Sequence, residues 1–167
     1  MPANTELFKK YPNPVFVETG SHKGEGIQQA INAGFGLIYS VEIIPEYYEL
    51  CTNRFRGVTN VDIILGDSRI VLRELLPIIR QPITFWLDAH LCLPNDITAI
   101  LEEIEIIKQH SVKTHTILID DLRDWNITSC GFDVNTLKDR LREINPNYTF
   151  KFEDGHVPND ILVAVIE

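Results

Sequence analysis

Apolar positions along the chain form short runs that alternate with longer periodic stripes, a pattern that predicts alternating strands and helices. The short runs begin at residues 15, 37, 61, 83 and 116. Their separations suit crossover helices between parallel strands and are too long for hairpin turns. The stripes predict the core faces of three helices: Ile44, Tyr47, Tyr48, Cys51 and Phe55; Val71, Leu72, Leu75, Leu76 and Ile79; Ile97, Ile100, Leu101, Ile104 and Ile107.

Both ends of the chain depart from this rhythm. Residues 1–14 are polar with three prolines, and we expect a lead-in segment with one helical turn around Leu7 and Phe8. Near the other end, residues 148–152 alternate and residues 161–166 are apolar, which predicts a hairpin. We expect Ser68 and Asp133 to cap the helices that follow them. The pattern predicts one domain over residues 1–167, a doubly wound Rossmann-like α/β sandwich with three layers.

Composition narrows the function classes. The 167 residues carry a net charge of −9, and 44% of them are hydrophobic, as in an ordinary globular protein. The negative charge disfavours nucleic acid or an anionic membrane as a partner. The chain has neither an apolar run long enough to span a membrane nor an apolar signal segment, and its three cysteines are widely spaced. We therefore expect a cytoplasmic protein.

The stretch Val15-Phe-Val-Glu-Thr-Gly-Ser-His-Lys-Gly-Glu-Gly26 predicts a buried strand, a glycine-rich turn and the start of a helix. Gly20 and Gly24 would let the backbone and the helix N-terminus approach a ligand closely. Such a turn after a first strand is a usual cofactor seat in α/β sheets, although it could also bind nothing. Dinucleotide folds use G-x-G-x-x-G, and His22 stands where the second glycine would be, which disfavours an NAD-dependent oxidoreductase.

The pattern Glu-x-Gly-x-x-x-Gly resembles motif I of class I S-adenosylmethionine-dependent methyltransferases, especially the metal-dependent catechol and caffeoyl-CoA O-methyltransferases. The resemblance implies S-adenosylmethionine as cofactor, activity of the EC 2.1.1 class, and a mostly parallel seven-stranded sheet in the order 3-2-1-4-5-7-6 with an antiparallel C-terminal hairpin. The expected cofactor-binding residues are Glu18, Gly20, Ser21, His22, Gly24, Glu42, Asp67 and Ser68.

Two of these residues also have a position that supports the assignment. Glu42 follows the second strand, where a carboxylate can accept hydrogen bonds from ribose hydroxyls. In the family, the acid after the third strand contacts the adenine amino group, and Asp67 matches it. Glu42 could instead be a solvated charge, and Asp67 could cap the next helix. Tyr47 and Tyr48 could stack on adenine or simply pack in the core.

Asp88, Asp120 and Asp121 follow the fourth and fifth strands, whose ends should be neighbours in the sheet. Three converging carboxylates repel one another unless a proton or a cation intervenes, and Mg²⁺ prefers oxygen ligands. The segments TFWLDAH and ILIDDL resemble the metal-binding segments of the metal-dependent O-methyltransferases. The alternative is that Asp120 and Asp121 cap a turn while Asp88 bonds to backbone.

Asp88 and His90 are the predicted catalytic residues. The family's usual base lies three residues after the metal-binding aspartate, where this chain has Leu91, so His90 is the nearest candidate base. His90 could equally be a loop histidine, and Lys23 and Arg123 are further polar loop candidates. The family also has extra N-terminal helices over the acceptor, and their absence here suggests an open site or one completed in a homo-oligomer. We expect Mg²⁺-assisted O-methylation of a small hydroxylated acceptor; the alternative is a cofactor-binding or scaffold protein without catalysis.

Overall fold

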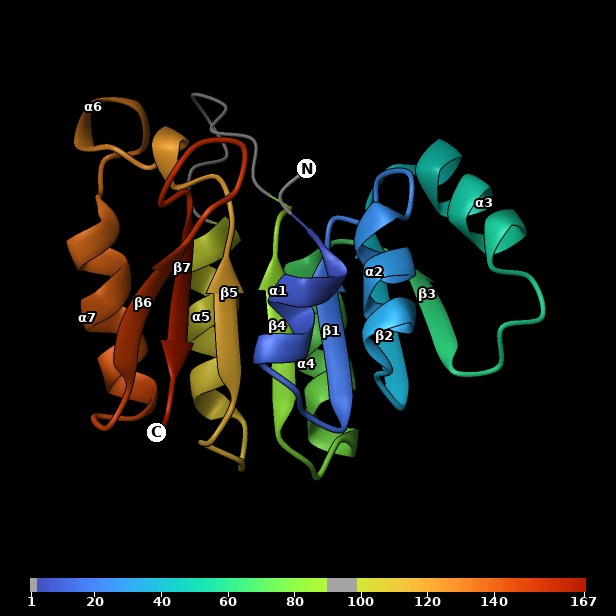
Figure 1. Ribbon diagram of the computed structural model, residues 1–167, viewed down its shortest axis with the longest axis horizontal. Coiled ribbons are helices and arrows are strands. Elements are labelled where there is room, and N and C mark those ends of the chain that lie inside the picture. Colours follow the sequence, from blue (N-terminus) through green and yellow to red (C-terminus); the bar gives the residue numbers. More distant parts are fainter. Residues whose placement is uncertain (1–2, 90–98) are drawn as a thin grey trace.

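The computed structural model describes residues 3–89 and 99–167, which build one seven-stranded sheet in the order β3-β2-β1-β4-β5-β7-β6 (Figure 1). The first five strands are parallel, and β7 runs antiparallel to both β5 and β6. The strands are β1 (Val15–Thr19), β2 (Leu37–Glu42), β3 (Val61–Leu65), β4 (Ile83–Leu87), β5 (Thr116–Ile119), β6 (Thr149–Glu153) and β7 (Ile161–Val165). This confirms the predicted fold class and strand order.

Helices cover both faces of the sheet (Figure 1). One face carries α1 (Thr5–Lys10), α2 (Glu25–Ala33) and α3 (Pro45–Arg54). The other carries α4 (Ser68–Leu75), the 3₁₀ turn η1 (Leu76–Ile78), α5 (Ala99–Gln109) and α7 (Val134–Ile144). The short elements η2 (Leu122–Asp124) and α6 (Ile127–Cys130) follow β5. In the part of the chain described, no helix is long and apolar enough to cross a membrane.

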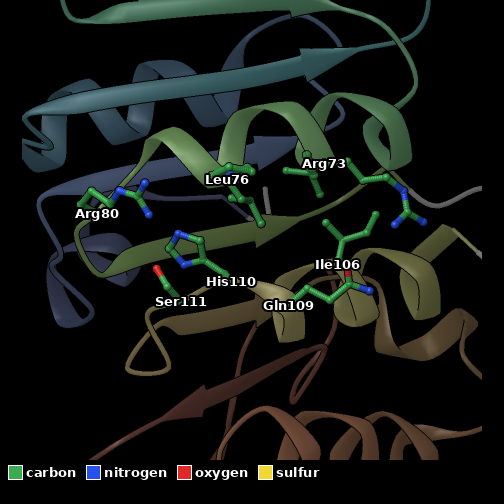
Figure 2. Close-up of a pocket in the computed structure, with 9 residues that line it drawn as sticks. Arg73, Leu76, Arg80, Ile106, Gln109, His110 and Ser111 are labelled. Carbon is green, nitrogen blue, oxygen red and sulfur yellow. The ribbon is translucent and has the colours of Figure 1, made fainter.

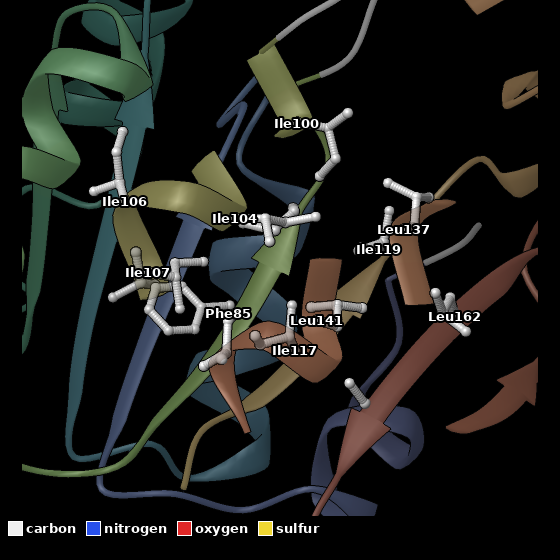
Figure 3. Close-up of a cluster of buried hydrophobic side chains, with 14 of the residues drawn as sticks. Phe85, Ile100, Ile104, Ile106, Ile107, Ile117, Ile119, Leu137, Leu141 and Leu162 are labelled. Atoms are coloured by element: carbon white, nitrogen blue, oxygen red, sulfur yellow. The ribbon is translucent and has the colours of Figure 1, made fainter. Parts of the chain in front are cut away.

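The larger apolar core lies between the sheet and α4, α5 and α7, where Phe85, Ile104 and Leu141 are almost completely buried (Figure 3). The stripes predicted for α4 and α5 face this core, apart from Val71, which is buried outside it, and Ile97, which lies outside the described residues. The stripe predicted for α3 is only partly right. Cys51 and Phe55 are buried, but Ile44 is 41% exposed, because α3 covers the edge of the sheet.

The lead-in segment belongs to the second core, on the other face of the sheet. Asn4 caps α1 by accepting a hydrogen bond from the Leu7 amide. Phe8 is completely buried, with its ring 4.9 Å from that of Phe16 and 5.3 Å from that of Trp86. This one helix therefore contributes aromatic packing that its polar composition did not indicate.

The two predicted caps have different outcomes. Asp133 caps α7 by accepting from the amides of Asn135 and Thr136, as expected. Ser68 is wrong as a cap, because Asp67 is the N-cap of α4 and accepts from the Arg69 amide. A carboxylate one residue earlier reaches the free amides of the first turn, which leaves the Ser68 hydroxyl for another partner.

Candidate active site

The glycine-rich turn joins β1 to α2 at the edge of the sheet where the parallel strands end. Gly20 and Gly24 have φ values of 87° and 82°, which favour glycine. A Cβ on Gly20 would lie 2.9 Å from the carbonyl oxygen of Asp88, so only glycine lets the turn rest against the end of β4. His22 also has a positive φ, of 46°. The turn thus touches the strand end that carries the first aspartate of the acid cluster.

Glu42 ends β2 beside this turn and is 4% exposed. Its carboxylate accepts one hydrogen bond from the His22 amide at 2.7 Å and one from the Ile44 amide at 2.8 Å. Each oxygen keeps a second lone pair for a further donor. The His22 ring stands edge-on to Tyr47 at 4.5 Å, and Ile43, which sequence reasoning missed, is 61% exposed directly after Glu42. The carboxylate of Glu42 and the exposed apolar surface of Ile43 therefore lie together beside the turn.

Glu18 lies beneath the turn rather than on its surface. Its side chain is buried, accepts a hydrogen bond from Ser40 at 2.5 Å, and leaves no room for a side chain at Gly26. Ser40 in turn pairs with Ser21 at 2.6 Å. Burial raises the pKa of Glu18 to about 8, and the Ser40 hydrogen bond opposes that shift. Glu18, Ser40 and Ser21 therefore form a buried support for the turn.

Asp67 lies beyond β3 on the same edge, and its carboxylate is bound by Arg69. The Arg69 side chain donates to both carboxylate oxygens, with a closest distance of 2.6 Å, and these bonds lower the pKa of Asp67. Ser68 points elsewhere and donates to the buried Glu103 of α5 at 2.5 Å. The structure thus brings Asp67 to the predicted edge and joins Ser68 to α5 instead.

Asp88, Asp120 and Asp121 come together as predicted, with one carboxylate oxygen of each within 4.8 Å of the others. Asp120 is fully buried, and neither of its side-chain oxygens has a hydrogen-bond partner in the described parts of the chain. Burial raises the pKa of Asp120 to about 8, and the charge of Asp88 adds to the shift. A buried carboxylate without partners is costly unless a proton or a cation neutralises it. The donor set fits a hard divalent cation such as Mg²⁺.

A second set of charges surrounds this acid cluster, and sequence reasoning missed its central residue, Asp160. Asp160 is 1% exposed and directly precedes β7. Because β7 is antiparallel, its start lies at the edge where the parallel strands end. The predicted hairpin contained that signal, because a residue that precedes an antiparallel strand lies at the same edge as residues that follow parallel strands. Arg123, a weak sequence candidate, contacts both Asp160 and Asp121.

The predicted base, His90, lies outside the described residues, as does Leu91.

One groove of about 340 Å³ lies away from the acid cluster, between the last turns of α4 and α5 and beside η1 (Figure 2). Leu76 and Ile106 line it, and His110 lies at the end near the start of β4. The two rings of His110 and His115 link the Ile79 carbonyl to the Ile83 amide through contacts of 2.9 to 3.1 Å. Because His115 Nδ1 accepts from the Ile83 amide, His115 Nε2 can donate to His110 Nδ1, and His110 Nε2 can donate to the Ile79 carbonyl. Every ring nitrogen then has a hydrogen-bond partner. These histidines explain the local packing and are not part of the candidate active site.

Comparisons with known proteins agree with the fold. No family model matches the chain. A protein-L-isoaspartate O-methyltransferase from Thermosipho melanesiensis is 31% identical over 72 residues, which are 42% of this chain and 36% of that protein, so the match spans only about a third of the relative.

Solved structures match over almost the whole chain. An O-methyltransferase from Bacillus cereus, in complex with S-adenosylhomocysteine, has a TM-score of 0.66 at 12% identity, over 98% of this chain and 78% of that one. The O-methyltransferase TomG from Streptomyces achromogenes, in complex with S-adenosylmethionine, gives 0.61 at 13%, over 98% and 78%. An rRNA methylase from Streptococcus thermophilus gives 0.60 at 13%, over 98% and 94%. The chain has the Rossmann-like fold of the methyltransferases.

Proposed function

We propose that this chain is an S-adenosylmethionine-dependent methyltransferase that methylates a hydroxyl group of a small acceptor with the help of Mg²⁺. The observation that carries the proposal is the contact between the glycine turn and the end of β4. Gly20 touches the backbone of Asp88, and the Asp88 amide donates to Thr19 at 3.2 Å. A cofactor seated on the turn would therefore have its reacting end beside the acid cluster.

The proposed cofactor contacts follow from the geometry of the edge. The turn from Gly20 to Gly24, with Ser21 and His22, would approach the cofactor through its backbone. Glu42 would accept hydrogen bonds from the ribose hydroxyls with its remaining lone pairs. Ile43 offers apolar surface for the base, and Asp67 would accept from the adenine amino group while Arg69 holds its carboxylate in place.

For the chemistry, methyl transfer requires an acceptor oxygen held in line with the methyl carbon and made nucleophilic. Asp88, Asp120 and Asp121 would hold Mg²⁺, which supplies positive charge that lowers the pKa of an acceptor hydroxyl. His90 is the proposed base that removes the proton. These roles account for Asp120, the one buried carboxylate whose oxygens have no hydrogen-bond partner in the described part of the chain.

A small acceptor is favoured over a nucleic acid, although one structural neighbour is named as an rRNA methylase. The net charge is −9. Two arginines near the site, Arg69 and Arg123, already form ion pairs with aspartates. Both guanidinium groups are therefore already neutralised by carboxylates, which disfavours a phosphate backbone as the acceptor.

The test measures methyl transfer from labelled S-adenosylmethionine to a panel of catechols, sugars and other hydroxylated small molecules. We expect turnover that EDTA abolishes and that Mg²⁺ or Mn²⁺ restores. Asp120→Asn should lose turnover yet bind S-adenosylhomocysteine as the wild type does, because Glu42 and the turn lie at other strand ends. Asp62→Asn, at an exposed position in β3, is the matched control and should keep full activity.

Other outcomes identify the alternatives. Activity that survives both EDTA and Asp120→Asn would mean that the acid cluster is structural. Binding of S-adenosylhomocysteine without turnover on any acceptor would favour a cofactor-binding or scaffold protein. If NAD binds while S-adenosylmethionine and S-adenosylhomocysteine do not, the oxidoreductase alternative replaces our proposal.

A further inference from the structure

Asp160 is held by more donors than any simple capping role requires. One carboxylate oxygen accepts from the Arg123 amide at 3.1 Å, and the other accepts from the His156 amide at 3.1 Å and from the Arg123 side chain. The Asp160 carbonyl oxygen also accepts from the Leu122 amide at 2.8 Å. These bonds fix the loop between β6 and β7 against the segment that follows β5.

Arg123 connects this anchor to the acid cluster. Its Nη2 lies 2.8 Å from Asp121 Oδ1, while its Nη1 binds Asp160. The guanidinium is thus shared between Asp121, which belongs to the cluster, and Asp160, which does not, because among the described residues the cluster comprises Asp88, Asp120 and Asp121. Its Nε also lies 3.9 Å from the carboxylate of Asp124. An arginine beside an acidic metal site is a built-in cation that can compete with a metal for the same carboxylates.

The loop that carries Asp160 also packs against Asp120. A Cβ on Gly155 would lie 2.9 Å from the Asp160 Cβ and 3.3 Å from Asp120 Oδ1. Asp120 is fully buried, and its oxygens have no partner among the described residues, so they need an occupant. If Arg123 moved closer to Asp120, its guanidinium would become the partner of these carboxylate oxygens.

We propose that Asp160 is a positioning residue that holds the guanidinium of Arg123 at the outer side of Asp121 and so keeps the acid cluster available to a divalent cation. This inference rests on the proposed function, which assigns Mg²⁺ to the cluster. Without the Asp160 charge, Arg123 turns fully to the aspartates of the cluster and lowers their affinity for metal. Residues that orient metal ligands from outside the coordination shell typically change metal affinity by about 10-fold to 100-fold.

The experiment is a double-mutant cycle in Mg²⁺ affinity, measured by calorimetry on the wild type, Asp160→Asn, Arg123→Gln and the double variant. We expect Asp160→Asn to weaken Mg²⁺ binding by about 10-fold to 100-fold. Arg123→Gln should bind Mg²⁺ as tightly as the wild type or more tightly, because the competing cation is gone. In the Arg123→Gln background, Asp160→Asn should change the affinity by less than about threefold.

The controls are Asp139→Asn and Arg142→Gln, which break an exposed ion pair of 2.8 Å on α7 with the same charge changes. Neither should alter Mg²⁺ affinity. Equal weakening by Asp160→Asn in both backgrounds, or no weakening, would overturn the inference while leaving the metal site in place. A wild type that does not bind Mg²⁺ would overturn both the metal assignment and the inference. If Asp160→Asn does not fold, weaker Mg²⁺ binding by Arg123→Gln alone overturns it.

Discussion

At the scale of single residues, two carboxylates near neighbouring strand ends, Glu18 and Glu42, have different surroundings. Glu18 is the last residue but one of β1 and Glu42 is the last residue of β2, yet Glu18 lies beneath the glycine turn and Glu42 lies beside it. That difference depends on Ser40 and on the space left at Gly26, which are contacts between segments far apart in the chain. Asp160 escaped prediction for a related reason, since its place at the site depends on the direction of β7.

The buried Glu18 should make stability depend on pH. Its pKa is about 8 in the folded protein against an ordinary value of 4.5, so the folded state keeps a proton that the unfolded state has lost. The free energy of unfolding contributed by Glu18 therefore falls as pH rises from about 4.5 to about 8. Glu18→Gln removes this titration and keeps an acceptor for Ser40, so its melting temperature should exceed that of the wild type increasingly between pH 5 and pH 8.

Thermal unfolding at several pH values measures this difference. Glu46→Gln, at an exposed position in the first turn of α3, is the control and should show no such trend. A gap between Glu18→Gln and the wild type that stays constant from pH 5 to pH 8 would show that Glu18 is ionised in the folded protein.

At the scale of elements, long amphipathic stripes predicted α4 and α5 well because a stripe of several turns has one clear apolar face. The short α1 offered only Leu7 and Phe8, too few residues to show a period, and yet Phe8 packs on Phe16 and Trp86. For α3 the pattern predicted too much burial. All five residues of its stripe were expected in the core, but α3 covers the edge of the sheet and only part of the stripe is buried. For both α1 and α3, the extent of burial depends on where the helix packs on the sheet, and the local sequence pattern does not contain that information.

The glycine turn allows a sharp test of close packing. Gly24 and Gly34 both have positive φ values, 82° and 91°, but a Cβ on Gly24 would lie 2.6 Å from Phe55 Cε2, whereas one on Gly34 would meet nothing within 4 Å. Gly34→Ala should therefore lose only the strain of a side chain at positive φ, about 1–2 kcal/mol. Gly24→Ala should lose clearly more stability in urea unfolding, because Phe55 must move as well, and should weaken binding of S-adenosylhomocysteine. Equal losses for the two variants would mean that the turn adjusts without cost.

At the scale of the whole molecule, strand spacing and the terminal hairpin predicted a parallel sheet followed by a hairpin, because few topologies satisfy parallel crossovers. The order of the seven strands was implied by the resemblance to class I methyltransferases, and the structure has that order. The fold is shared with methyltransferases at only 12% to 13% identity in the three structures compared, so the fold does not specify the acceptor. The convergence of the turn, Glu42 and the acid cluster on one edge supports the proposed function. That convergence follows from the parallel strands, whose ends all meet there.

The most direct test of the account is calorimetric titration of the wild type, Glu42→Gln and Glu46→Gln with S-adenosylhomocysteine and with NAD. We predict that S-adenosylhomocysteine binds the wild type and Glu46→Gln equally and that NAD does not bind. Glu42→Gln should bind S-adenosylhomocysteine at least about tenfold more weakly, because hydrogen bonds to a charged acceptor are lost. Binding of NAD without S-adenosylhomocysteine, or equal binding of S-adenosylhomocysteine by Glu42→Gln and the wild type, would contradict the account.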